Sequence, residues 1–167
     1  MNHEATHETG SRQAAHEKGR QHYRHLLVMA FLSFLAMYVL MYAMVDRLAN
    51  AYANLNQAYM AALMAAPMVI IELLVMRAMY RDARANATWI TASALVLVGC
   101  FLLIRAQAGI GDRQFVRSMI PHHAGAILMC EQASLRDPEL KALCEQIRAS
   151  QQAEIDQMKA ILKTIDR

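Results

Sequence analysis

Adjacent histidines with methionines at helical spacing are the residues of this 167-residue chain best suited to chemistry. On a wheel of about 100° per residue, Met119, His122 and Met129 share one helix face, and His123 lies on its flank. Both histidines can bind one ion only if the helix is distorted, and Pro121 offers such a distortion. Imidazole nitrogen with thioether sulfur suits Cu(I) or Ag(I) better than Mg²⁺, Ca²⁺ or Mn²⁺. The spacing indicates a soft-metal site, or else ordinary surface histidines and core methionines.

A second helix must lie beside this one to complete such a site. Residues 112–167 are charged and helix-forming with one clear break, so we expect antiparallel helices over 112–135 and 138–165. Asp137 is a good N-cap, and Pro138 suits the first helical position. The second helix carries an apolar stripe: Leu140, Leu143, Ile147, Ile155, Met158 and Leu162. Because so small a hairpin buries little on its own, we expect a second copy or the preceding helices to complete a four-helix core.

Folding this hairpin about residue 137 brings residues whose numbers add up to about 274 side by side. Three side chains of the second helix then come close to the histidines and their methionines: Gln151, Glu154 and Met158. Cys130 and Cys144 lie opposite one another. In an oxidising compartment they would form a disulfide. The alternatives are that they are small buried hydrophobic residues or further copper ligands.

The string Met-Ile-Pro-His-His at 119–123 resembles the family called domain of unknown function 305. Flanking positions that carry the resemblance include Phe115, Ala126, Ile127, Leu140, Leu143 and Ile147. The resemblance covers residues 112–165. It implies a ferritin-like helical bundle, and copper-binding members of the CopM type are periplasmic or secreted. It also implies a ligand set: Met119, His122, His123, Met129 and Met158. Gln151 and Glu154 match family positions in a supporting role, orienting these ligands.

Three apolar blocks precede the hairpin. Residues 26–45 carry no charge, and at about 1.5 Å per residue they can cross a hydrocarbon layer of about 30 Å. Blocks 58–76 and 87–104 have similar lengths. Hydrophobic residues make up 56% of the chain, more than one soluble domain needs. We expect three transmembrane helices, the first of them an uncleaved anchor because a long polar segment with several acids precedes it.

Basic residues in the flanks predict the orientation. Seven Lys and Arg lie in the N-terminal tail and after the second span, against four in the first loop and after the third span. This favours a bacterial inner-membrane protein with a cytoplasmic, histidine-containing tail over 1–25. A membrane domain would follow over 26–106, and a periplasmic metal-binding domain over 107–167. Two histidines of the tail, His3 and His7, share a face if the tail is helical, so the tail could capture a metal ion.

We therefore expect an all-α, homo-oligomeric membrane protein that binds Cu(I) or Ag(I) for sequestration or resistance and holds no organic cofactor. In one alternative the hairpin only oligomerises. In another the chain is a metal-transporter subunit that uses a row in the second span: Met60, Met64, Met68 and Glu72. We expect no enzyme, since no Gly-rich phosphate loop and no Gly-x-Ser-x-Gly string is present. We expect no nucleic-acid binding either, since no basic stripe interleaves with aromatic residues.

Overall fold

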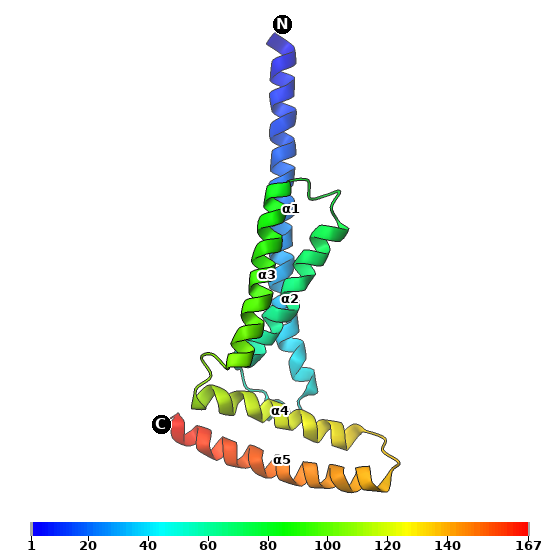
Figure 1. Cartoon of the computed structure of the whole chain (residues 1–167), viewed down its shortest axis with the longest axis vertical. Helices are drawn as coiled ribbons and strands as arrows, with labels where there is room; N and C mark the ends of the chain where they lie inside the picture. The colour runs from blue at the N-terminus through cyan, green and yellow to red at the C-terminus, as the bar shows by residue number, and fades with distance from the viewer. Residues whose placement is uncertain (1, 167) are drawn as a thin grey trace. The chain divides into compact units, whose positions relative to one another are not determined.

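The protein is helical throughout the part that the structure describes. The computed structural model describes the backbone of residues 2–166 and the side chains of residues 19–166. Five α-helices and two short 3₁₀ helices follow one another (Figure 1): α1 Asn2–Leu40, η1 Met41–Met44, η2 Leu48–Asn50, α2 Leu55–Val75, α3 Ala83–Ala106, α4 Asp112–Gln132 and α5 Pro138–Ile165. No strand occurs among residues 2–166, so the predicted all-α class is confirmed.

Three of these helices are long and apolar enough to cross a membrane, as the sequence predicts. Their extents are Gly19–Met44, Leu55–Val75 and Ala83–Ala106, with mean hydropathies of 2.3, 2.1 and 2.2. The third begins four residues earlier than expected because the Asp82 side chain caps it. The Oδ1 atom of Asp82 accepts hydrogen bonds from the backbone N–H groups of Arg84 and Ala85, at 2.9 and 3.1 Å.

The chain divides into two compact units that cut across the predicted segments. Unit 1 comprises residues 1–37 and 61–102, and unit 2 comprises residues 38–60 and 103–167. Residues 38–60 belong to the predicted membrane domain over 26–106, and that division stays a prediction. In the structure they pack with the C-terminal helices, because apolar side chains of this stretch lie against the core that those helices form.

Unit 1 is held together by a small core that α1, α2 and the α2–α3 connection share. Leu26, Val69, Leu73 and Tyr80 are its buried members. The Tyr23 hydroxyl of α1 donates a hydrogen bond of 2.7 Å to Oδ1 of Asn86. The beginning of the first span and the α2–α3 connection therefore lie at the same end of this unit.

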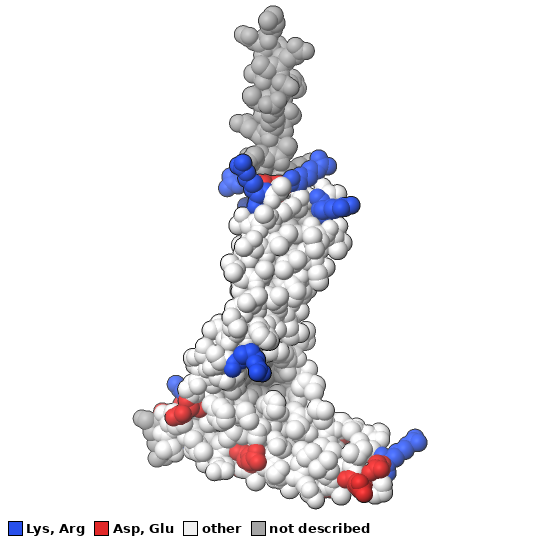
Figure 2. Space-filling model, in the orientation of Figure 1, with Lys and Arg blue, Asp and Glu red and all other residues white. Residues whose placement is uncertain are grey.

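Basic side chains gather at this same end of unit 1. They come from α1, from the α2–α3 connection and from the first turn of α3: Arg20, Arg24, Arg77, Arg81 and Arg84. Figure 2 shows Lys and Arg side chains around an end of the helices, next to a stretch of surface without charge. In a three-span topology, the segment before the first span and the segment after the second span lie on the same side of the membrane. The structure places these two segments at the same end of unit 1.

In unit 2, α4 and α5 lie side by side and antiparallel (Figure 1). Two contacts fix the ends of the pair. Cys130 and Cys144 form a disulfide near the connection, and Nη2 of Arg113 lies 2.8 Å from Oδ1 of Asp166 at the other end. The buried core between the two helices consists of Val116, Ile120, Ala124, Ile127, Ile155 and Leu162.

The beginning of α5 has the predicted cap. The Asp137 side chain accepts hydrogen bonds from the N–H groups of Glu139 and Leu140, at 2.8 and 3.0 Å, and Pro138 occupies the first turn. In α4, by contrast, Pro121 does not end the helix, which continues to Gln132. The backbone therefore carries the adjacent histidines through one continuous helix.

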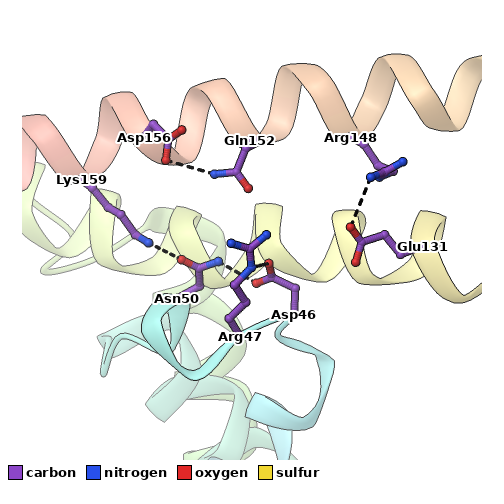
Figure 3. A network of polar contacts seen from close by, with 8 residues as sticks. All are labelled: Asp46, Arg47, Asn50, Glu131, Arg148, Gln152, Asp156 and Lys159. Atoms are coloured by element: carbon purple, nitrogen blue, oxygen red, sulfur yellow. Dashed lines mark hydrogen bonds and ion pairs between the residues drawn. The ribbon is translucent and has the colours of Figure 1, made fainter.

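The segment before α2 covers this core and is tied to α5 by polar contacts. Val45 and Tyr52 pack against the core. Asp46, with a side chain only 3% exposed, lies 3.1 Å from Nε of Arg47, and the Asn50 amide donates to it at 2.6 Å. Lys159 of α5 in turn donates to the Asn50 side-chain oxygen (Figure 3). Residues 45–52 are thus an integral part of unit 2.

Candidate metal site

A groove of about 520 Å³ lies in unit 2 between α4 and the segment 41–60. We call it the methionine groove, because five of the residues that line it are methionines. The full lining is Met41, Tyr42, Met44, Val45, Asn54, Asn56, Gln57, Met60, Ser118, Met119, Pro121, His122, Gly125, Ala126 and Met129. No Asp, Glu, Lys or Arg is among the lining residues, so none of these charged side chains faces the groove.

One wall is the α4 face on which the sequence places a metal-binding set. Met119, His122 and Met129 all line the groove. His122 is exposed, Met119 is half-buried, and the Met129 side chain is 59% exposed. The structure thus brings together three of the five predicted ligands, along one face of one helix.

The opposite wall adds three methionines that sequence reasoning did not connect with the site. Met41 and Met44 belong to η1, and Met60 lies in the first turns of α2. The sequence grouped Met60 with the row along the second span and left the other two as part of an apolar block. Their spacing along the chain carries no signal for a shared site, because the two walls are far apart in sequence and meet only through packing.

A glycine allows the two walls to approach closely. A Cβ atom on Gly125 would lie 3.3 Å from the carbonyl oxygen of Met44, tighter than most contacts of that kind. The atom in the way belongs to the backbone and cannot rotate aside. The absence of a side chain at position 125 therefore lets η1 rest directly on α4 and keeps Met44 next to the His/Met face.

Polar side chains on the walls are used to hold the walls in place. The Tyr42 hydroxyl donates to the Tyr52 carbonyl at 2.9 Å, and the Gln57 amide donates to the Tyr38 carbonyl at 2.8 Å. The remaining three also form hydrogen bonds: Asn54, Asn56 and Ser118. Among the polar side chains that line the groove, His122 alone makes no hydrogen bond. Its imidazole is the free nitrogen donor of the groove.

His123 faces a different environment from His122. Its side chain is 11% exposed, and its Nδ1 atom lies 3.0 Å from Oε2 of Glu154 on α5. The ring centroids of the two histidines are 6.1 Å apart, with the planes inclined at 59°. Burial lowers the pKa of His123 below the usual 6.5; Glu154 opposes this shift, and His122 adds to it. The adjacent imidazoles thus diverge, as their wheel positions predict.

The remaining residues of the predicted set lie on α5. Met158 packs against the buried core of unit 2, and Gln151 is half-buried. Neither these two nor His123 and Glu154 line the methionine groove. Their placement follows from the register of α5 against α4: Glu154, rather than Gln151, is the residue beside His123.

Of the three alternatives for Cys130 and Cys144, the structure has the disulfide, with the Cα atoms 5.3 Å apart. It joins the end of α4 that carries Met129 to the beginning of α5. These sulfurs are therefore not thiolate ligands. The free thiol of the described residues is Cys100, within α3.

The side chains of residues 19–166 form no cluster of three or more His, Cys, Asp or Glu that could hold a metal ion. Zinc sites usually require such a cluster, built from His, Cys and carboxylate side chains. What the groove offers instead is thioether sulfur with one imidazole, a donor set that suits a soft ion. The residues present thus fit Cu(I) or Ag(I).

The row along the second span is divided between the two units. Met60 lines the groove of unit 2, whereas Met64, Met68 and Glu72 belong to unit 1. Glu72 lies beside the hydroxyl of Tyr80, a residue that follows α2. Burial raises the pKa of this tyrosine, and the neighbouring carboxylate acts in the same direction.

The histidines at the start of the chain form a further motif. Residues 3–7 read His-Glu-Ala-Thr-His, which is the spacing that places two imidazoles on one face of a helix in zinc hydrolases. The backbone is helical there, within α1. The side chains of these residues lie outside the described ones, so the prediction of metal capture by the tail stays a prediction.

Comparison with known proteins places the C-terminal helices in a described family. The family "Domain of unknown function (DUF305)" matches residues 103–167. An uncharacterised protein of Acanthamoeba polyphaga mimivirus is 33% identical over 140 residues, which cover 82% of this chain and 90% of that protein. No solved structure matches the chain. The match to the viral protein extends beyond residues 103–167, since it covers 82% of this chain.

Proposed function

This chain belongs to the family of DUF305 proteins, and from that premise we propose that it binds a soft monovalent metal ion, Cu(I) or Ag(I), at the His/Met face of α4. The ligands are Met119, His122 and Met129. The observation that carries the proposal is that all three line one groove, in which His122 is the free polar side chain. Thioether and imidazole donors bind such ions in preference to Mg²⁺, Ca²⁺ or Mn²⁺.

We assign His123 and Glu154 a positioning role in this site. With the pKa of His123 lowered, its imidazole is neutral near pH 7, and its Nδ1 atom lies 3.0 Å from Oε2 of the Glu154 carboxylate. This contact fixes the rotation of α4 against α5, and that rotation turns the neighbouring His122 towards the groove. Met158 supports the same rotation, since it packs against the core of unit 2.

We further propose that α4 and α5 lie on the periplasmic side of a bacterial inner membrane, with the N-terminus in the cytoplasm. Two observations support this orientation. Five arginines gather at the end of unit 1 that would face the cytoplasm. The Cys130–Cys144 disulfide, in unit 2, fits an oxidising compartment. The function would then be to sequester copper or silver in the envelope. A reporter fused to the C-terminus that is active only in the cytosol would contradict this orientation.

Silver binding by the full chain in detergent tests the proposed site. Ag(I) requires no reductant, so the disulfide stays intact, and a Cys100→Ala background removes the free thiol. The variant Met119→Leu/His122→Gln/Met129→Leu should lose about 100-fold or more in affinity, since removing even an outer-sphere partner of a ligand costs about 10–100-fold. Isothermal titration measures the affinity.

A matched control makes one His→Gln and two Met→Leu substitutions outside the groove. The variant His25→Gln/Met64→Leu/Met68→Leu alters one histidine and two methionines of unit 1, none of which lines the groove. It should bind Ag(I) as tightly as the parent protein. If the α4 variant and this control bound equally well, the proposed site would be wrong.

A further inference from the structure

We infer that the metal site of this protein is completed by methionines from outside the DUF305 domain: Met41, Met44 and Met60. The inference rests on the proposed function and extends it, because it assigns further ligands and the charge of the bound ion. None of the three lies in residues 103–167, the part that matches the family. All three line the same groove as Met119, His122 and Met129.

Sulfur donors lie on both walls of the groove. A single helix face presents its ligands from one side only, and Met129 is mostly exposed on it. The wall formed by η1 and the start of α2 provides three thioethers on the other side of the same groove. A soft ion held between the walls would thus be surrounded by sulfur rather than left open to water on one side.

Hydrogen bonds hold the wall that carries these methionines in place. Asn54 Oδ1 accepts from the Gln57 N–H at 2.9 Å, and the Leu55 N–H donates to Oε1 of Gln114 on α4 at 3.0 Å. Asn56 donates to Ser118 of α4 at 3.4 Å. At the other end of the wall, Met44 contacts α4 closely at Gly125. Donors on a fixed wall bind without the cost of ordering a loose segment.

The side chains that line the groove also favour an ion of low charge. Since no acidic side chain lines the groove, nothing there neutralises the charge of a bound cation. The cost of removing an ion from water rises with the square of its charge, so an uncharged groove selects a monovalent ion over a divalent one. Five thioethers and one imidazole therefore assign the groove to Cu(I) or Ag(I) and not to Cu(II) or Zn²⁺.

Methyl NMR of the full chain tests the ligand assignment without any substitution. The protein carries ¹³C-methyl methionine and is titrated with Ag(I) in detergent, in the Cys100→Ala background. The methyl signals of Met41, Met44 and Met60 should shift together with those of Met119 and Met129, saturating at the same Ag(I) concentration. Signals of unit 1 methionines such as Met64 should stay in place.

Leucine substitutions test whether the second wall contributes to binding. Leucine conserves the volume of methionine and removes its sulfur. The variant Met41→Leu/Met44→Leu/Met60→Leu should lose about tenfold or more in Ag(I) affinity. X-ray absorption on the Ag(I) complex should count fewer sulfur neighbours in it than in the parent protein. The matched control Met64→Leu/Met68→Leu/Met76→Leu should change neither quantity, and a large excess of Zn²⁺ should not displace Ag(I) from the parent protein.

The outcomes separate this inference from the proposed function. If the second-wall variant kept the parent's affinity and sulfur count while the α4 variant lost binding, α4 alone would form the site, and the inference would be wrong. If the α4 variant bound as tightly as the parent, the proposed function would fail and the inference with it. Displacement of Ag(I) by Zn²⁺ would overturn the charge argument.

Discussion

Gly125 sets the distance between the two walls of the methionine groove. A Cβ atom there would lie 3.3 Å from the Met44 carbonyl oxygen, and the larger side chain of valine would have to displace the backbone of η1. We expect Gly125→Val to destabilise the protein by about 1–3 kcal/mol, the usual cost of overpacking. Thermal unfolding in detergent, without metal, measures the change.

Gly99 provides the control for this substitution. It lies within helix α3, and a Cβ atom there meets no other atom within 4 Å. Gly99→Val makes the same change of helix propensity and should leave stability almost unchanged. Equal effects of the two substitutions would show that Gly125 is not a contact point.

His123 makes the stability of the metal-free protein depend on pH. Its pKa in the folded protein is below the 6.5 of the unfolded chain, because burial disfavours the charged ring. Well above pH 6.5, the His123 imidazole is neutral in both the folded and the unfolded protein, so it costs no stability. As the pH falls through 6.5 and then through the lowered folded value, the unfolded chain takes up the proton first, so stability falls.

The substitution His123→Gln should make this loss smaller. The measurement is the unfolding midpoint between about pH 7.5 and pH 5.5, the range in which histidine titrates. His25→Gln serves as the control, because His25 is exposed and belongs to unit 1, whereas His123 belongs to unit 2. An equally steep loss in His123→Gln would assign the pH dependence to another group.

At the scale of elements, the α4–α5 pair depends on the disulfide near its connection. Cys130 and Cys144 are separated by 14 positions in the chain, and closing a loop of this size stabilises a fold by about 3 kcal/mol in the chain-entropy description. The double variant Cys130→Ser/Cys144→Ser should lose up to this amount. A reductant should lower the unfolding midpoint of the parent protein and leave that of the double variant unchanged.

The α4–α5 pair also shows where helix-level prediction succeeds and where it fails. The limits of α5, Pro138–Ile165, are those that the sequence predicts, because Asp137 and Pro138 act locally on the first turn. The register between the helices differs. At the disulfide, the paired residues are the expected ones, since 130 and 144 add up to 274. Farther from the connection, Glu154 lies beside His123, where Gln151 was expected. A shift of three residues is about one helical turn, and it depends on how the two core faces interlock.

At the scale of the whole molecule, unit 2 needs residues from before the second span. Val45 and Tyr52 cover its core, and Asn50 ties this segment to Lys159 of α5. A fragment of residues 103–167 alone would expose that part of the core to water. We expect the fragment to self-associate and to bind Ag(I) more weakly than the full chain.

Size-exclusion chromatography and titration of the fragment check this expectation. The comparison is the full chain in detergent, with the same Cys130–Cys144 disulfide. A monomeric fragment that bound Ag(I) with the affinity of the full chain would show that the segment 38–60 is dispensable. That result would also leave α4 as the complete site.

Four features follow from the amino-acid sequence alone: the all-α class, three apolar helices of membrane length, the cap of α5 and the His/Met face of α4. These features are local, because hydropathy, capping and wheel position depend on neighbours within a few turns. Met119, His122 and Met129 were predicted on one face for this reason, and the structure places them along one groove.

Only the tertiary structure decided what lies opposite that face. Met41, Met44 and Met60 reach the groove because η1 packs on α4 at Gly125, a contact between parts of the chain that are distant in sequence. The packing of α5 against α4 places Glu154 beside His123 and Met158 against the core. Side-chain packing between helices fixes their rotation and register, and the residue pattern of a single helix does not contain that information.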